Sequence, residues 1–231
     1  MDDARHLDPL IHRPAHWLHG PQLAIVVSLD DPQSANRVQV RLVSCDDADR
    51  QDAALWARVV SPFAGRDRGA FLMPDVDDEV LVVFHNGDPS CPLVIGGLWN
   101  GSSTAPASLA GGNTHKVIRS KNGVTLTLDD SQGQERFRVE TPGGQSLTLS
   151  DGPGVVRIED SNGNSIEMNS RGIEVIAAST VKVQAAKVEV SAGMVNVDAA
   201  MSKFSGVVRC DTLIASAVVS TSYTPGAGNV W

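Results

Sequence analysis

The sequence is poor in residues on which whole classes of protein depend. Lys and Arg number 19 against 27 Asp and Glu, so the net charge is −8. That balance, with no Lys/Arg-rich stretch, argues against binding to nucleic acid or to an anionic membrane. Aromatic residues make up 4% of the 231, so a core must be built mainly from Val, Ile, Leu and Ala. The three cysteines, Cys45, Cys91 and Cys210, are far apart and odd in number, which does not indicate a disulfide framework or a zinc site.

Membrane and export signals are also missing. No apolar run approaches the roughly 20 residues that span a bilayer. The polar segment 1–20 contains Pro9 and Pro14 and has no hydrophobic stretch of the kind a signal peptide needs. We therefore expect a chain that is made in the cytoplasm, with residues 1–20 as a leader.

Residues 21–100 have the pattern of a small all-β domain. Five β-like runs are separated by turn signals rich in Asp, Gly and Pro. Closing five short strands into a barrel leaves no exposed sheet edge, so an OB-type barrel is the expected fold. The expected strands are Leu23–Leu29, Arg37–Val43, Leu55–Val60, Glu79–Phe84 and Leu93–Leu98.

A Gly-, Ser-, Ala- and Pro-rich stretch, residues 101–113, is typical of a linker. The following segment, residues 114–231, is repetitive. In three places a Gly turn leads into alternating apolar residues, which is the period-two pattern of a half-buried strand. These places are GVTLTLDD from Gly123, GQSLTLSD from Gly144 and GNSIEMNS from Gly163.

From Val181 to Met201 the repeat has a strict period of seven: VKVQAAK, VEVSAGM and VNVDAAM. A coiled coil also has this period, but it needs apolar residues at the first and fourth positions, and the fourth residues here are polar. The first, third and fifth positions are apolar, and they share one face only on a strand. We predict that they face inward: Val181, Val183, Ala185, Val188, Val190, Ala192, Val195, Val197 and Ala199.

The strict repeat predicts a homotrimer. Six inward Val residues per chain do not offset the backbone entropy of 21 ordered residues, so further burial must come from other copies. Seven residues cover one side of a triangular prism, and small Val and Ala side chains fit a narrow axis. The predicted fold class is therefore all-β, with an N-terminal OB-fold barrel followed by an intertwined trimeric β-helix, or β-prism, over residues 114–231.

Residues 56–101 contain an ordered set of turn and core residues. The set is Arg68-Gly69, Pro74, Asp78-Glu79-Val80, Phe84, Gly87-Asp88-Pro89, Pro92, Gly96-Gly97 and Trp99-Asn100-Gly101. It resembles the OB domain of phage baseplate assembly protein V and of the valine–glycine repeat (VgrG-like) spike proteins of type VI secretion. Asp77 departs from the pattern, because the family often has Gly there. The tail, Met201–Trp231, is similar to the spike terminus of extracellular contractile injection systems.

The resemblance implies a structural central spike in the baseplate of a phage-tail-like contractile injection system. Such a homotrimer would sit on a hub protein at the tube end and puncture the target envelope on sheath contraction, meeting the membrane only mechanically. The leader would contact the hub, which we expect to be a separate protein because no hub domain precedes the barrel. A tip protein of the proline-alanine-alanine-arginine repeat (PAAR) class would dock at Tyr223, Asn229, Val230 and Trp231. Effector cargo is a further implied partner, and the particle would be a virion tail or an extracellular injection system released by lysis.

The sequence gives little sign of chemistry. It has no nucleophile elbow, no phosphate-binding loop and no dinucleotide fingerprint, so we expect neither an enzyme nor a cofactor. Pro14 interrupts the helical spacing of the leader histidines, so we expect no metal there. These histidines are His6, His12, His16 and His19. The carboxylates Asp75, Asp77, Asp78 and Glu79 fit no calcium loop and indicate a turn at the barrel rim.

Two alternatives remain open at this point. A trimeric tail fibre or adhesin stalk would need a receptor-binding head after the stalk. Only about 30 residues follow the strict repeat, which is short for such a head. A spike-borne hydrolase would need an acid, a base and a nucleophile.

OB barrels also bind single-stranded nucleic acid through exposed aromatics. We expect no such partner and assign the aromatics to the core: Trp56, Phe63, Phe71, Phe84 and Trp99.

Overall fold

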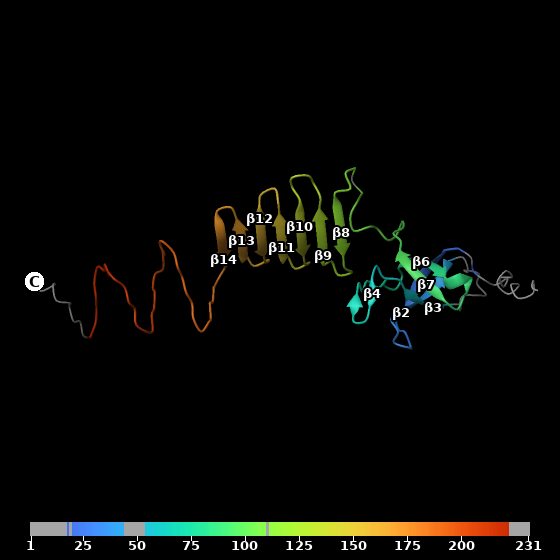
Figure 1. Ribbon diagram of the computed structural model, residues 1–231, viewed down its shortest axis with the longest axis horizontal. Coiled ribbons are helices and arrows are strands. Elements are labelled where there is room, and N and C mark those ends of the chain that lie inside the picture. The colour runs from blue at the N-terminus through green and yellow to red at the C-terminus, as the bar shows by residue number, and fades with distance from the viewer. Residues whose placement is uncertain (1–17, 19, 44–53, 110, 222–231) are drawn as a thin grey trace, which may run out of the picture. The chain divides into compact units, whose positions relative to one another are not determined.

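The computed structural model describes residues 18, 20–43, 54–109 and 111–221 (Figure 1). The chain divides into two compact units, Met1–Thr180 and Val181–Trp231. The first unit contains a closed barrel and a seven-stranded sheet. Within the described residues its regular structure is almost entirely β, with one short 3-10 turn, η2, at His85–Gly87.

The barrel has five strands in the order β1-β2-β3-β7-β6, and β6 pairs with β1 to close it. All neighbours are antiparallel except β3 and β7, which are parallel. The five strands lie within a residue or so of the predicted runs, and the closed barrel is consistent with the predicted OB fold. They are β1 Gln22–Ser28, β2 Arg37–Leu42, β3 Leu55–Val59, β6 Glu79–Phe84 and β7 Pro92–Gly97.

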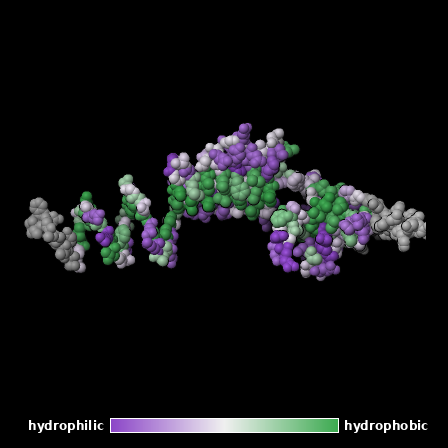
Figure 2. All heavy atoms as spheres, in the orientation of Figure 1, coloured by the Kyte–Doolittle hydropathy of each residue, from purple (hydrophilic) through white to green (hydrophobic). Residues whose placement is uncertain are grey.

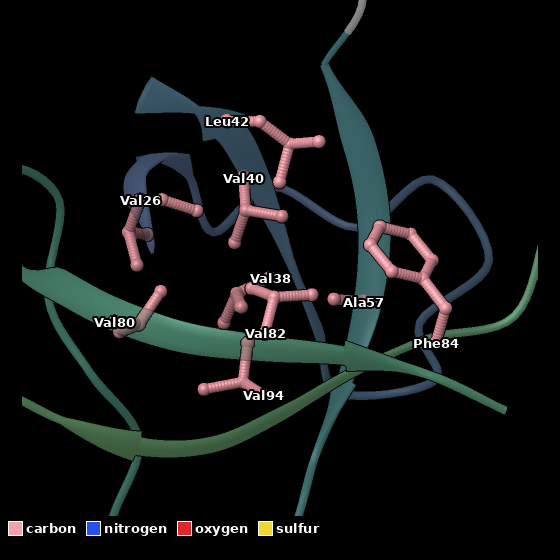
Figure 3. Close-up of a cluster of buried hydrophobic side chains, with 10 residues drawn as sticks. Val26, Val38, Val40, Leu42, Ala57, Val80, Val82, Phe84 and Val94 are labelled. Carbon is pink, nitrogen blue, oxygen red and sulfur yellow. The ribbon is translucent and has the colours of Figure 1, made fainter. Parts of the chain in front are cut away.

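The barrel core is built from small aliphatic side chains, as the scarcity of aromatics requires. On β2 and β6 every second residue is buried, because successive side chains of a strand point to opposite faces. The buried members converge inside the barrel, with Phe84 as the one large ring among them (Figure 3). They are Ala24, Val26, Val38, Val40, Leu42, Ala57, Val80, Val82, Phe84 and Val94.

The assignment of five aromatics to this core is wrong for most of them. Phe84 is buried, but Phe63, Phe71 and Trp99 are exposed and Trp56 is half-buried. Phe63 and Phe71 lie around a short hairpin, β4 Ala64–Gly65 with β5 Arg68–Gly69, where the sequence indicated only a turn. They line an open hollow there, so the hairpin holds them away from the barrel interior.

The predicted turn of carboxylates lies immediately before β6. The Asp75 backbone N–H donates to Asp78 Oδ2 at 2.8 Å, and the Asp77 N–H donates to the Val26 carbonyl oxygen at 2.9 Å. Asp77 has φ +72°, a left-handed conformation that glycine adopts without steric cost. This conformation agrees with the Gly that the OB domains resembled by the sequence often have there, and Asp is a short polar residue that also adopts it.

Asp31 organises the loop between β1 and β2. Its carboxylate receives an ion-paired hydrogen bond from Arg37 Nη2 at 2.6 Å and hydrogen bonds from the backbone N–H groups of Gln33, Ala35 and Arg37. The hydrogen bond from Arg37 is the largest cause that holds the pKa of Asp31 well below its usual range. The Arg37 guanidinium also lies over the Trp56 ring, 5.6 Å from its centre. The half-exposed Trp56 thus contacts the first residue of β2, whose side chain in turn holds Asp31 of the loop.

The second sheet of the first unit is an antiparallel meander in which each strand pairs with the next along the chain. We call it the meander sheet. Three of its strands, β9, β11 and β13, are the predicted loose repeats, and the strands beside them were not predicted. Its strands are β8 His115–Arg119, β9 Thr125–Asp129, β10 Arg136–Glu140, β11 Ser146–Ser150, β12 Val155–Glu159, β13 Ser165–Asn169 and β14 Gly172–Ile176.

The glycines that begin the three loose repeats lie in the turns of this meander. Gly123, Gly144 and Gly163 have φ between +85° and +90°, a region that other residues adopt only at a steric cost. A Cβ atom on Gly144 would approach Ser161 Cβ to 3.2 Å, and one on Gly123 would approach Pro142 Cγ to 3.2 Å. The repeated Gly is therefore needed for the reversal that brings each strand back beside its neighbour.

The second unit has no strand ladder within its described residues, 181–221. Its backbone runs extended between bends at Ala186, Gly193 and Ala200, which repeat the seven-residue period of the sequence. Figure 1 shows it as a zigzag trace without arrows or helices. The coiled-coil alternative is therefore wrong, whereas the predicted strands of the prism stay a prediction, because a ladder needs a partner strand.

Candidate trimerisation surface

One face of the meander sheet is apolar across all seven strands. Each strand contributes two side chains, two residues apart, and the pairing register aligns them in two rows. The first row is Lys116, Leu128, Phe137, Leu149, Val156, Met168 and Ile173. The second row is Ile118, Leu126, Val139, Leu147, Ile158, Ile166 and Val175. Thirteen of these fourteen positions are apolar. We call them the apolar face.

The apolar face is not covered by the chain itself. None of its fourteen residues is buried, and more than half are classed as exposed. Figure 2 shows hydrophobic residues as a continuous green band over the strands of this sheet, with hydrophilic residues gathered at one set of loop ends. Monomeric proteins rarely expose a continuous apolar surface of this extent, and such surfaces mark sites of protein–protein contact. The face therefore has the character of an interface.

The opposite face of the same sheet is polar and carries ion pairs, some within one strand and one between the neighbouring strands β12 and β13. Arg157 Nε lies 2.8 Å from Glu159 Oε2, and Arg157 Nη1 lies 3.4 Å from Glu167 Oε2. Arg138 Nε similarly lies 2.8 Å from Glu140 Oε2. Exposed pairs of this kind contribute about 0–1 kcal/mol each to the free energy of unfolding. Their charged groups make this face suited to contact with solvent. The two faces together give the sheet one side for solvent and one side for a partner.

Asp129 is the best-connected carboxylate of the polar face. Hydrogen bonds from the Ser131 hydroxyl, at 2.6 Å, and from the Ser131 backbone N–H, at 3.1 Å, are the largest causes that lower its pKa. His115 Nε2 and Arg136 Nη2 lie 3.5 Å and 3.3 Å from its Oδ2 atom and act in the same direction. These groups tie the first three strands together at one end.

The predicted trimer core of the seven-residue repeats is exposed in a single chain. Its six valines are 61–72% exposed, and no ladder pairs their strands within residues 181–221. The Lys187 ammonium pairs with Glu189, so the polar positions make contacts along the chain while the apolar positions make none that bury them. This segment does not complete a hydrophobic core within one copy.

Several other predicted sites lie outside the described residues. They are the leader histidines His6, His12, His16 and His19, and the expected tip-docking residues Tyr223, Asn229, Val230 and Trp231. Among the residues that the structure describes, no three His, Cys, Asp or Glu side chains cluster as metal ligands. Cys91 and Cys210 are exposed free thiols. No helix in the described ranges is long and apolar enough to cross a membrane.

The continuous apolar face was the main feature that sequence reasoning missed. The signal was present in the segments between the three Gly-initiated repeats. The segments RFRVE at 136–140 and VVRIE at 155–159 alternate with period two. Their apolar residues fall in the same two rows as those of the neighbouring strands. Applying the same alternation test to every segment would have found the added strands, and the turn lengths would have given their register.

Comparisons with known proteins give matches for two parts of the chain, one over the barrel and one over the later strands and repeats. Residues 22–99 match the type VI secretion system/phage-baseplate injector OB domain, which covers the barrel. Residues 136–202 match the phage baseplate V C-terminal trimerisation domain, which covers β10 to β14 and the seven-residue repeats. Two separate parts of the chain therefore match domains of one kind of injection machine, and the family resemblance found in the sequence is confirmed. The second match supports a homotrimer.

Of three similar proteins, two are named as spike proteins and one as a toxin. The type VI secretion system spike protein VgrG1c of Pseudomonas aeruginosa is 25% identical over 162 residues, which are 64% of this chain and 22% of that protein. The spike protein VgrG5 of the same organism is 31% identical over 149 residues, 58% of this chain and 18% of the relative. The actin cross-linking toxin VgrG1 of Vibrio cholerae is 25% identical over 144 residues, 54% of this chain and 12% of the toxin. The aligned regions thus span less than a quarter of the length of these relatives.

Proposed function

We propose that this protein is the central spike of a contractile injection system. The matches to an injector OB domain and to a baseplate trimerisation domain support this proposal. The spike is a homotrimer in the baseplate of a phage-tail-like particle. Sheath contraction drives it through the target envelope. The observation that carries the proposal is the apolar face, since thirteen apolar positions in two aligned rows need cover that one chain does not supply.

In this trimer the three meander sheets pack with their apolar faces toward a common axis. Residues 181–201 of the three copies form a β-prism around its axis, and the strand ladders of this prism run between chains. Val181, Val188 and Val195 at the first position, with the third- and fifth-position residues, line the axis. This arrangement supplies the missing backbone partners of the repeats, because each copy offers its extended segment to the next.

The proposed mechanism is mechanical. A shaft in which backbone hydrogen bonds join three chains resists bending and unfolding, because no chain leaves the ladder without breaking contacts to both others. The barrel domain sits on a separate hub protein at the tube end, with the leader as a contact to that hub. A PAAR-type tip protein caps the far end at Tyr223–Trp231, and effector cargo travels with the assembly. Assembled particles are therefore the expected location of the chain.

The chain is proposed to act structurally and not as an enzyme. The relatives named above are mostly called spike proteins, and the match to the actin cross-linking toxin covers 12% of that protein, so its named activity is not attributed to this chain. The acidic balance also disfavours nucleic acid as a partner, although aromatics such as Phe63 and Phe71 are exposed on the barrel. The adhesin-stalk alternative shares the trimer and differs in needing a receptor-binding head.

A matched pair of variants on the central strand β11 tests the proposal. Leu147→Asp places a charge on the apolar face, whereas Thr148→Asp places the same charge on the polar face one residue away. We expect Leu147→Asp to abolish the trimer and to remove the protein from particles purified from producing cells, because an unpaired charge buried among apolar side chains is strongly unfavourable. Thr148→Asp should retain both. Equal behaviour of the two variants, or particles that assemble and kill without this protein, would contradict the proposal.

A further inference from the structure

One long side of β8 carries backbone groups that point away from the meander sheet. β8 is an end strand of this sheet, and among the described residues it pairs only with β9 (Figure 1). At the two ends of this pairing, the Asp130 backbone N–H donates to the Thr114 carbonyl oxygen at 2.8 Å, and the Ser120 N–H donates to the Val124 carbonyl oxygen at 2.9 Å. Hydrogen-bonded positions alternate along an antiparallel ladder, so the even-numbered residues of β8 bond to β9. The odd-numbered residues direct their N–H and C=O groups outward.

These outward residues are His115, Val117 and Arg119, and we call their backbone side the free edge. Their side chains lie on the polar face, because the other two residues of β8 belong to the apolar face. All three line an open hollow on the polar face, together with residues of β9 and β10. An unpaired edge of this kind accepts an extended chain through the same main-chain hydrogen bonds that join neighbouring strands.

The free edge is basic, although the chain as a whole is acidic. Residues 89–128 contain no Asp or Glu, whereas residues 115–121, HKVIRSK, contain two Lys and one Arg. The Lys116 ammonium lies 3.7 Å from Asp130 Oδ2, but the Arg119 guanidinium makes no hydrogen bond or ion pair with the residues that the structure describes. Two copies of this edge would bring like charges together, which disfavours their pairing. The charge therefore favours an acidic partner.

We propose that the free edge binds an extended acidic segment of another protein, which adds to the sheet as a strand antiparallel to β8. Residues that face each other in an antiparallel pair have their side chains on the same face of the sheet. The residues that bond to the free edge therefore place their side chains on the polar face beside Arg119, where acidic groups fit. The alternate residues of the segment lie beside Ile118 on the apolar face, where apolar groups fit. The proposal does not depend on the homotrimer, because the pairing of β8 with β9 is complete within one copy.

A peptide with selectively blocked backbone groups tests the proposal on the full chain. The probe is a fluorescein-labelled peptide of alternating Glu and Val, about seven residues long. N-methylation of the Glu nitrogens removes the N–H groups that would face β8, whereas N-methylation of the Val nitrogens removes those that would face solvent. We expect fluorescence anisotropy to give a dissociation constant of about 1 mM or lower for the unmethylated peptide. Methylation at Glu should weaken binding by about tenfold or more, and methylation at Val by less than about threefold.

Two charge-reversal variants test the position of the site. Arg119→Glu reverses the charge beside the free edge, and Arg171→Glu makes the same change in the turn between β13 and β14, at the other end of the sheet. We expect Arg119→Glu to weaken binding of the unmethylated peptide by about fivefold or more, and Arg171→Glu to leave it unchanged. Thermal unfolding followed by circular dichroism checks that both variants fold as the original chain does.

The outcomes that overturn the proposal are distinct. Equal binding of the two methylated peptides would show attraction by charge alone, without strand addition. Equal binding of the two protein variants would place the site elsewhere. The proposal also fails if a peptide of alternating Lys and Val binds as tightly as the Glu peptide, or if the Glu peptide does not bind at about 1 mM. None of these results bears on the proposed spike, which the variants of β11 test separately.

Discussion

At the scale of single residues, short polar side chains stabilise the turns that set the strand register. Asp160 is the clearest case in the meander sheet, between β12 and β13. Its Oδ1 atom accepts hydrogen bonds from the backbone N–H groups of Asn162 and Asn164, each at 2.9 Å, and its Oδ2 atom accepts one from Asn164 Nδ2 at 2.7 Å. These bonds, with that from the Asn164 side chain the largest cause, lower the pKa of Asp160 to about 2.

The lowered pKa of Asp160 predicts a specific dependence of stability on pH. A carboxyl group whose pKa falls on folding contributes stability above its unfolded value of 3.8, and this contribution is lost as the pH falls through about 2. Asp160→Asn keeps the shape but removes the titrating group. We expect the thermal midpoint of the original chain to fall more steeply between pH 4 and pH 2 than that of the variant. Parallel curves for the two proteins would show that Asp160 carries no such contribution.

At the scale of elements, two regions of the chain differ in whether their backbone N–H and C=O groups find hydrogen-bond partners within one copy. The strands of the meander sheet pair with their neighbours in sequence, so their hydrogen bonds are complete within one copy except at the two edges. Residues 181–221 have the same alternation of apolar residues but no ladder within the described chain. The first arrangement folds locally and leaves only side chains to be covered, whereas the second needs partners for both backbone and side chains.

Cysteine accessibility tests the predicted core of the seven-residue repeats. In a chain whose Cys45, Cys91 and Cys210 are replaced by Ser, Val190→Cys places a thiol at a predicted inward position and Ser191→Cys places one outward. We expect a maleimide to label the first about 100-fold more slowly than the second in the native protein, because reaction there requires local opening. Both should react alike in denaturant. Equal rates in the native protein would contradict the inward assignment.

The features that follow local rules were predictable from the sequence. The barrel strands were found because alternation and turn residues mark each of them, and the Gly-initiated strands β9, β11 and β13 were found for the same reason. The exposure of Phe63 and Phe71 was not predictable, because it depends on a two-residue hairpin, β4–β5, whose pairing has no periodic signal. The apolar face was missed because only three of its seven strands had been predicted, and its two rows become visible only when all seven strands are aligned in register.

At the scale of the whole molecule, the central claim is that one copy of this chain is an incomplete structure. The barrel has its own buried core, but the apolar face and the valines of residues 181–197 have none. The two regions have one pattern in common, apolar side chains two residues apart, repeated along strand after strand. Association of three copies would cover both regions. An account based on one copy would have to explain each exposed surface separately.

The mass of the native protein tests this claim most directly. The chain has a mass of 24.4 kDa, so native mass spectrometry of the full-length protein should give a single species of about 73 kDa, three times that of the chain. Because the interface is apolar, the trimer should persist when the ionic strength is raised before transfer to the volatile buffer. A stable, folded species of 24.4 kDa at micromolar concentration would contradict the account.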